Sequence, residues 1–413
     1  MTLGLPSCAG DQAMNLVKSS QPNVFRTPRV INAMVLACLF CTIAANAGAQ
    51  TSRREPSSDD AQRPPVGPGK VVVHTALGGE ILGYDIDQTG TEGLLSEFVA
   101  LNDGNSKIAV ETFDQKTGKI VKVVNQQNNT SSAWETLGVF GNHVGLAELE
   151  QEANLRVDKR AYLILNPLSS NQFTARWTPP LNANDIIVAT NETQGSSTTA
   201  MLFMKNTGDD FSSYVLSSNI AANTFGPVVQ VPDPIFDWDL SPVIAINSTT
   251  NQAVLGSSTG CVGPQCTTEI GLVDLTLGTF TEFEGLGLGS INGIAVDSNT
   301  GIACTTTEVD FNVEFYDLAA QTGIIVPMPG AVSQAQSGQA VAIDPIHKLF
   351  LIGQEFSSTS PSGSSIQVFD EQGNVVESLN GFSLPASPVN LALNPSLRLG
   401  FVYGGTTLQS FTY

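Results

Sequence analysis

The segment VPDPIFDWDLSP holds the densest group of side chains suited to chemistry. Asp233, Asp237 and Asp239 alternate there with Phe236 and Trp238. Carboxylates in one flexible loop supply the hard oxygen ligands that Ca²⁺ prefers, and an indole ring offers a stacking surface for a sugar or a peptide. We therefore expect the three aspartates to be metal ligands and all five residues to form a ligand-binding site. The alternative is that both rings pack between structural repeats while the aspartates cap turns.

The histidines indicate neither a catalytic site nor a zinc site. His74 falls in a predicted peripheral strand, whereas His143 and His347 follow apolar strands that lie well apart. They form no His-x-x-x-His pair, and the mature chain defined below has no Cys-x-x-Cys spacing. A Gly-x-Ser-x-Gly pattern occurs only in the displaced form GLGSING, away from a strand-to-helix elbow. We predict no catalytic residues and favour a protein that is not an enzyme.

The composition limits the class of partner. The formal net charge is -20, and such a surface repels phosphate backbones, so we exclude nucleic acid. The charge is compatible with bound cations, basic partners or simple solubility. Charged residues make up only 14% of the chain and hydrophobic residues 41%, which favours short strands joined by turns over long solvated helices.

Residues 1–49 are typical of a leader with an export signal. Arg26 and Arg29 precede an apolar run that is too short for a comfortable membrane span. Small residues then form an Ala-Gly-Ala cleavage site before Gln50, with Ala-Asn-Ala just upstream as a second site. We expect a signal peptide cleaved near Ala49-Gln50, a periplasmic or extracellular location, and no stable membrane insertion. A buried apolar strand is the alternative for this run.

Two patterns repeat along the rest of the chain. In one, a strand ends in an aromatic residue or Val plus Asp, and a Gly-containing turn and a second strand follow, at Asp114, Asp274, Asp317 and Asp370. In the other, an apolar strand ends in Asp or Asn, at Asp87, Asn142, Asn191, Asn247, Asp297, Asp344 and Asn394. Asp and Asn suit turns because their side chains bond to nearby backbone N–H groups. We interpret these residues as structural, including the faintly calcium-loop-like pair Asp85 and Asp87.

The second pattern indicates a β-propeller. The Asp and Asn residues that end these strands are called strand-end marks below. The last four marks, from Asn247 to Asn394, are spaced by 50, 47 and 50 residues, and each interval has room for four short strands. A period of this length with four antiparallel strands is the signature of a propeller blade. The sequence therefore predicts an all-β, seven-bladed propeller over residues 70–413, preceded by a flexible linker over residues 50–69. We expect the strand at 70–77 to complete the last blade, and we keep 143–162 as strands despite its helix-forming composition.

The hairpin D-x-x-T-G-K-I-V at 114–121 and the inner strands of form I-A-[VI]-[DN] resemble those of the seven-bladed YVTN/lactonase-like propellers. The resemblance covers roughly residues 70–413 and implies the fold. Members of that group include lactone hydrolases, surface-layer proteins and secreted binding proteins, so the resemblance leaves the activity open.

In propellers of this topology, the loops between blades share a face with the loops joining second and third strands. That face surrounds the channel mouth and would carry the acidic residues Asp103, Asp209, Asp210, Asp233, Asp237, Asp239, Glu308, Asp310 and Glu355. We expect a monomeric binding or interaction module that uses these loops for a protein, a peptide or a glycan. The rival hypothesis is a metal-assisted hydrolase of the lactonase kind, with a divalent cation at the channel mouth.

Three cysteines remain after removal of the leader. Cys261 and Cys266 flank a small loop with Gly and Pro, and an exported protein favours a disulfide between them. Cys304 is then left as a buried free thiol. A pairing of Cys304 with one of the other two is the weaker alternative.

Overall fold

The computed structural model describes residues 66–101, 106–128, 132–153, 156–180, 186–192, 198–206, 211–231, 243–258, 267–289, 291–307, 312–329, 338–354, 365–382, 390–404 and 406–413. The regular structure of these ranges is entirely β-strand. They contain no helix that could cross a membrane. The predicted leader over residues 1–49 lies outside them, so its export signal stays a prediction.

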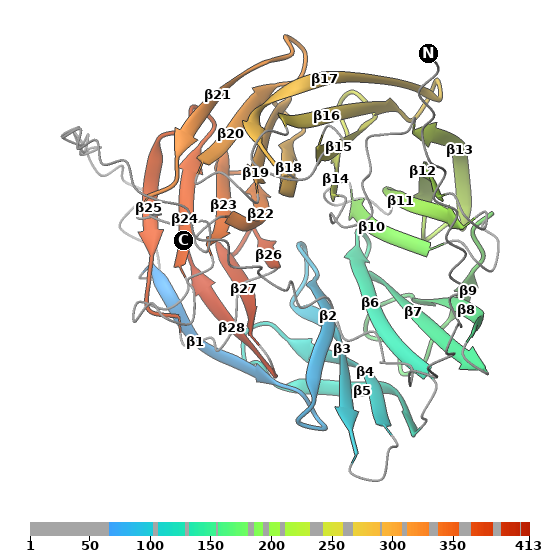
Figure 1. Cartoon of the computed structure of the whole chain (residues 1–413). Helices are drawn as coiled ribbons and strands as arrows, with labels where there is room; N and C mark the ends of the chain where they lie inside the picture. The colour runs from blue at the N-terminus through green and yellow to red at the C-terminus, as the bar shows by residue number, and fades with distance from the viewer. Residues whose placement is uncertain are drawn as a thin grey trace, which may run out of the picture. The chain divides into compact units, whose positions relative to one another are not determined.

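Seven four-stranded antiparallel sheets form the blades of a propeller, which confirms the predicted fold class (Figure 1). The first blade consists of β2 (Glu80–Ile86), β3 (Glu92–Ala100), β4 (Ser106–Asp114) and β5 (Ile120–Asn128). The second consists of β6 (Ser132–Phe140), β7 (Val144–Ala153), β8 (Arg156–Leu165) and β9 (Ala175–Trp177). The third consists of β10 (Ile186–Glu192), β11 (Thr198–Asn206), β12 (Phe211–Asn219) and β13 (Thr224–Val231). Strands β7 and β8 confirm the strands that were predicted within 143–162.

The remaining four blades repeat this arrangement. The fourth consists of β14 (Val243–Asn247), β15 (Gln252–Ser258), β16 (Thr267–Asp274) and β17 (Thr279–Leu288). The fifth consists of β18 (Ile291–Asp297), β19 (Ile302–Thr307), β20 (Asn312–Asp317) and β21 (Thr322–Pro327). The sixth consists of β22 (Gly338–Asp344), β23 (Leu349–Gln354), β24 (Ser365–Asp370) and β25 (Val375–Leu379). The seventh consists of β26 (Leu391–Asn394), β27 (Leu399–Gly404), β28 (Thr407–Thr412) and β1 (Gly67–His74).

The seventh blade combines both ends of the folded region. Strand β1 pairs antiparallel with β28, where Val73 lies opposite Leu408 and His74 opposite Thr407. The side chain of Phe401 packs edge-on against Phe113 of blade one, with ring centroids 5.6 Å apart. Apolar contacts of this kind join neighbouring blades and remove sheet faces from water.

Burial differs between inner and outer strands as the sequence pattern predicts. Every residue of β23 is buried, which matches its continuous apolar run. The outermost strand β21 alternates exposed and half-buried residues, and its Ile324 and Ile325 are exposed. A strand that is covered on both faces needs apolar side chains at consecutive positions, whereas an edge strand does not.

The Asp-and-Gly turn that repeats along the sequence has the same geometry in several blades. One carboxylate oxygen of Asp114 accepts hydrogen bonds from the backbone N–H groups of Lys116 (3.1 Å) and Thr117 (2.7 Å). The bonds from Thr117 are the main reason that the pKa of Asp114 is lowered. In blade six, Gly373 follows Asp370 with a φ of 77° and packs against the outer strand of blade five. These aspartates are structural, as predicted.

The strand-end marks are mostly where the spacing places them. Asn247, Asp297, Asp344 and Asn394 are the last residues of β14, β18, β22 and β26. The mark at Asn142 was wrong as a strand end, because Phe140 pairs directly with Val144 and Asn142 lies in the intervening turn. Cys304 lies in β19 as a buried free thiol, and burial raises its pKa well above the ordinary value.

Candidate functional site

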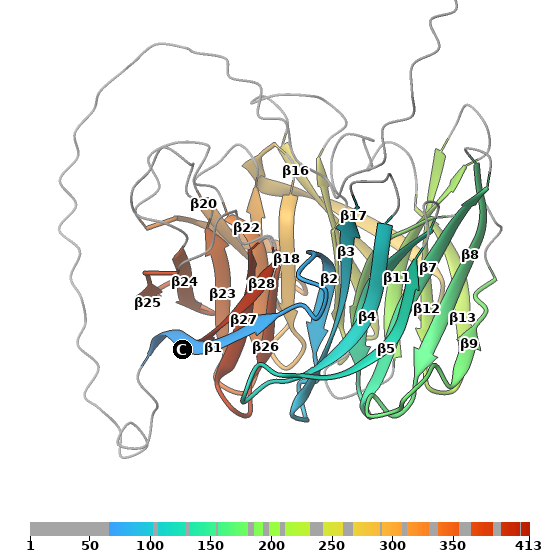
Figure 2. The same ribbon diagram turned by 90° about the horizontal axis from the view of Figure 1, so that it is seen from below.

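The two ends of the propeller differ in how strands are joined. In each antiparallel blade, the turns that join the first strand to the second and the third to the fourth lie at one end, the turn end. The segments that join the second strand to the third, and one blade to the next, lie at the opposite end, the loop end. Figure 2 shows the short turns side by side along the lower edge of the ring.

The predicted ligand-binding residues belong to the segment between blades three and four. Strand β13 ends at Val231 and β14 begins at Val243, so the segment between them joins blades three and four. It contains Asp233, Phe236, Asp237, Trp238 and Asp239, which lie outside the described residues. Cys261, Cys266 and the other acidic residues expected on this face also lie outside them, namely Asp103, Asp209, Asp210, Glu308, Asp310 and Glu355. The site, metal and disulfide assignments therefore stay predictions.

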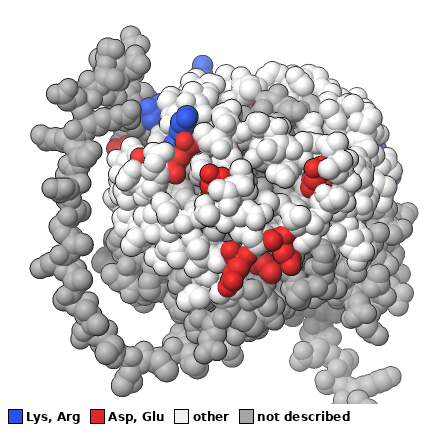
Figure 3. Space-filling view, turned by 90° about the horizontal axis from the view of Figure 1, so that it is seen from above, with Lys and Arg blue, Asp and Glu red and all other residues white. Residues whose placement is uncertain are grey.

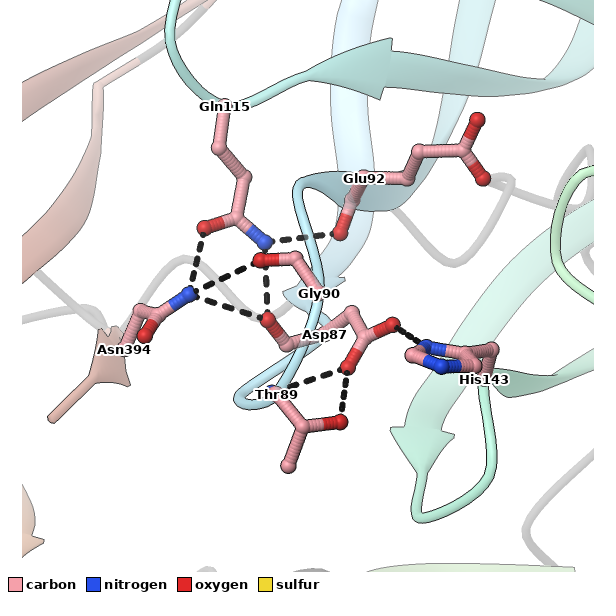
Figure 4. A network of polar contacts seen from close by, with 7 residues as sticks. All are labelled: Asp87, Thr89, Gly90, Glu92, Gln115, His143 and Asn394. Atoms are coloured by element: carbon pink, nitrogen blue, oxygen red, sulfur yellow. Dashed lines mark hydrogen bonds and ion pairs between the residues drawn. The ribbon is translucent and has the colours of Figure 1, made fainter. Parts of the chain in front are cut away.

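A polar network at the turn end joins blades seven, one and two (Figure 4). Asp87, which is buried, accepts hydrogen bonds from the backbone N–H (2.9 Å) and the hydroxyl (3.0 Å) of Thr89 through one oxygen. Its other carboxylate oxygen contacts Nδ1 of His143 in blade two. The imidazole remains half exposed, so one nitrogen faces a buried carboxylate while the ring edge reaches solvent. Asp87 is thus a turn acid that also orients a histidine.

Asn394 connects the last blade to the first within the same network. Its amide Nδ2 donates to the backbone oxygens of Asp87 (3.3 Å) and Gly90 (3.1 Å) and to Oε1 of Gln115 (3.1 Å). Gln115 in turn donates from Nε2 to the backbone oxygens of Asp87 and Glu92, each at 2.8 Å. Asn394 and Gln115 are almost fully buried, so these bonds replace water for several backbone carbonyl groups.

Asp85 connects the inner strands of blades one and two. One oxygen accepts a hydrogen bond from the backbone N–H of Val139 at 2.7 Å, and the other accepts one from Ile86 at 2.7 Å. Burial, with a smaller contribution from the nearby Asp87, outweighs the two hydrogen bonds, which lower the pKa, and raises the pKa of Asp85 to about 6. Asp85 therefore links strands β2 and β6 through hydrogen bonds, and it does not cap a turn as the sequence interpretation of this pair suggested.

A second histidine–aspartate pair lies at the turn end of blade six. Asp344 is buried and accepts hydrogen bonds from the backbone N–H groups of Ile346 (2.9 Å) and His347 (3.0 Å). Its other oxygen lies 2.7 Å from Nδ1 of His347. Burial, followed by the adjacent Asp344, raises the pKa of Tyr413, and the guanidinium of Arg398 lies 5.6 Å from the centroid of that ring.

Both pairs place a carboxylate at Nδ1 of an imidazole. This arrangement selects one tautomer and leaves Nε2 to accept a proton, as in a general base. A base needs a nucleophile or a water-derived proton within reach. Among the described residues, the groups around these pairs include backbone amides, the side-chain amide of Asn394, Thr89 and Tyr413. His143 has a φ of 61° and its neighbour Asn142 a φ of 63°, so the backbone is strained where it presents the ring. The observed contacts indicate that both pairs stabilise turns and contacts between neighbouring blades.

His143 and His347 lie in turns, as the sequence predicts, but their carboxylate partners were not predicted. Asp87 and His143 are 56 residues apart, and Asn394 and Gln115 are 279 apart. The available signal was the repeat itself, because residues that end neighbouring inner strands must meet at one end of the ring. That signal places the side chains close together without showing which of them bond.

Charge in the described part of the chain is also uneven. In blade four Glu269 lies opposite Glu284 on the neighbouring strand, and burial together with Glu282 and Glu284 raises the pKa of Glu269. Figure 3 looks onto the side of the ring that carries β17, where acidic side chains gather in a group with few basic ones nearby. Within the described ranges, no three His, Cys, Asp or Glu side chains are grouped so that they could hold a metal ion.

Comparison with known proteins gives no family assignment. No protein-family model matches the chain, and no curated protein is a significant relative. The seven-bladed propeller fold therefore rests on the structure itself, and the likeness to the YVTN/lactonase-like group remains a likeness of short motifs.

Proposed function

We propose that the chain is an exported binding or interaction module whose acidic loop-end segments bind a protein, a peptide or a glycan. The observation that supports this most directly is that the two ends of the propeller differ: one carries short hydrogen-bonded turns and the other carries the connections between blades. At the turn end, Asp87, Asn394 and Gln115 hydrogen-bond to turns and to neighbouring blades. The strand order assigns the connections between blades to the opposite end, and loops on a rigid scaffold commonly form binding surfaces.

Electrostatics favour a cationic group on the partner. The whole chain carries a net charge of -20. A lysine- or arginine-containing segment would be attracted to such a chain and would associate faster at low salt. Trp238 and Phe236 would add stacking for an aromatic or sugar ring.

Binding is tested by screening the mature protein against peptide and glycan arrays, followed by calorimetry on the strongest hits. Replacement of Asp233, Asp237 and Asp239 together by Asn is expected to weaken binding by about tenfold or more, as loss of a few central contacts commonly does. The matched control is Glu282→Gln with Glu284→Gln, which removes acidic charge from an exposed strand. Equal affinity of wild-type protein and the triple variant would refute the assignment of the site.

The same samples distinguish the rival hydrolase. Metal analysis and thermal unfolding with Ca²⁺ or EDTA show whether the three aspartates hold a cation. A tightly bound divalent ion, together with lactone hydrolysis that EDTA abolishes, would favour the hydrolase over the binding module.

A further inference from the structure

Two glutamates lie side by side in the interior of blade one. Glu97 of β3 and Glu111 of β4 each have 0% exposed surface. They lie beneath the segment 75–79, which joins β1 of the last blade to β2 of the first. Buried carboxyl groups are rare unless each is paired or hydrogen-bonded, so the contacts of this pair need an account.

Backbone N–H groups of the segment 75–79 donate to both carboxyl groups. The two oxygens of Glu97 accept from Leu77 at 2.7 Å and from Gly79 at 3.1 Å. One oxygen of Glu111 accepts from Ala76 at 3.0 Å. Three backbone N–H groups of the joining segment are therefore held by two side chains. Within the segment, the N–H of Gly78 donates to the carbonyl of Thr75 at 3.3 Å, and the hydroxyl of Thr75 donates to the carbonyl of Gly79 at 3.2 Å.

Within the described part of the chain, the pair has no basic partner. Among the described residues, no Lys, Arg or His forms an ion pair with either glutamate. Glu111 lies between Leu95 of β3 and Val123 of β5, and the segment 75–79 carries no charged side chain. The remaining oxygen of Glu111 is buried without a hydrogen-bond partner. Burial, followed by the adjacent Glu97, raises the pKa of Glu111 to about 8.

Blade six provides a neutral counterpart at the equivalent positions. Gln354 and Glu97 each lie five residues after the residue that pairs with the turn aspartate of their blade. Gln367 and Glu111 each lie three residues before that aspartate, which is Asp370 in blade six and Asp114 in blade one. There Nε2 of Gln367 donates to Oε1 of Gln354 at 3.2 Å. The amide pair makes its bond with a permanent N–H donor. Two carboxyl groups in the same geometry need a proton to make such a bond.

We propose that Glu97 and Glu111 share one proton and act as a pH-dependent latch that fixes the segment 75–79 and, through it, the junction between the last and the first blade. With the proton present, one carboxyl group donates to the other and both still accept from the segment. Loss of the proton leaves two buried carboxylates in contact, and their repulsion is relieved when the segment lifts and admits water.

The direction of the pH effect follows from the pKa shift. The pKa of Glu111 is raised from 4.5 to about 8, so the folded latch holds its proton more tightly than the unfolded chain. The stabilisation is complete below the unfolded value and is lost as the pH rises toward the folded value. Across that window the equilibrium constant for closing the latch falls by up to about tenfold for each pH unit.

Hydrogen exchange of the backbone amides of Ala76, Leu77 and Gly79 tests the latch in the full-length mature protein. After correction for intrinsic exchange rates, their protection is expected to fall by about tenfold or more between pH 6 and pH 9. The variant Glu111→Gln replaces the shared proton with a permanent donor and copies blade six, so its protection should change less than about twofold. The control Glu284→Gln, at an exposed position, should retain the wild-type response.

Protection of these three amides that is equal at both pH values in the wild-type protein would overturn the proposal. It would also be overturned if Glu111→Gln kept the full wild-type pH response. The wild-type measurement needs no substitution, so the proposal can be refuted even where the variant fails to fold.

Discussion

Asn394 offers the sharpest test of the turn-end network, because its amide group is surrounded by acceptors. Nδ2 donates to three oxygens, and Oδ1 accepts from the backbone N–H of Leu397 at 3.3 Å. The substitution Asn394→Asp keeps the shape and the acceptor but replaces the donor with an oxygen. A buried carboxylate then faces the backbone oxygens of Asp87 and Gly90 and the side-chain oxygen of Gln115.

The expected cost can be built from these contacts. Each lost hydrogen bond contributes about 1 kcal/mol, and a buried charge without a partner adds a further penalty, so the free energy of unfolding should fall by about 3–5 kcal/mol at neutral pH. Protonation restores one donor and removes the charge. The variant should therefore recover about 1–2 kcal/mol at mildly acidic pH, because its folded state has the raised pKa and binds the proton more tightly.

Urea unfolding of the mature protein at pH 5 and pH 7.5 measures both effects through the midpoint, provided the slope is unchanged. The matched control is Asn247→Asp, which also ends an inner strand. In the part of the chain that the structure describes, Oδ1 of Asn247 accepts hydrogen bonds from the backbone N–H groups of Thr249 and Thr250, at 3.2 Å each. The chain itself has Asp at the equivalent positions 297 and 344. That control should cost less than about 1 kcal/mol. Similar losses for both variants would refute the reasoning that donor geometry, rather than burial, sets the cost.

Two further predictions concern contacts between blades five and six. Gly373→Ala should lower the free energy of unfolding in urea by about 1–3 kcal/mol, because Gly373 has a φ of 77° and a Cβ would lie 2.6 Å from Val326. The control Gly381→Ala has a φ of 88° and no atom within 4 Å of the added Cβ, so it measures the cost of the backbone conformation alone. Burial and then Glu371 raise the pKa of Asp297, so the stability of the wild-type protein should decline with rising pH. In thermal unfolding from pH 4 to pH 8, the double variant Asp297→Asn with Glu371→Gln should show a smaller change of stability with pH. An unchanged profile would contradict the contact between these carboxyl groups.

The fold was predictable because its determinants are local and repeated. The Asp-and-Gly turn is encoded within a few residues: Asp274 accepts from Thr276 and Leu277, and Gly278 supplies the positive φ of 70°. Apolar strands that end in Asp or Asn recur because a turn follows each of them. The prediction for Asn142 was wrong because the turn there is shorter: three residues separate Phe140 from Val144, whereas four separate Asn247 from Gln252.

The polar contacts between blades were not predictable, because they depend on register across large separations. The strand pattern VETFD shows Glu111 as one polar position in an alternating run, and nothing local indicates that it faces Glu97 rather than solvent. Likewise, Gln115 and Glu371 stand where blades four and five have Leu275 and Leu318 in the same turn. A polar residue at a position that is apolar in other blades was a further signal that could have been read.

The two ends of the junction between the last and first blades respond differently to protons. At the turn end, Asn394 and Gln115 bond through amide groups that do not titrate. At the loop end, Glu97 and Glu111 hold the joining segment with a proton that rising pH removes. Loss of that proton should therefore free the segment while the opposite end stays bonded, so exchange should increase locally without opening the ring. Loss of protection throughout β1 and β28 at the same pH would instead indicate that the latch and the closing strand open together.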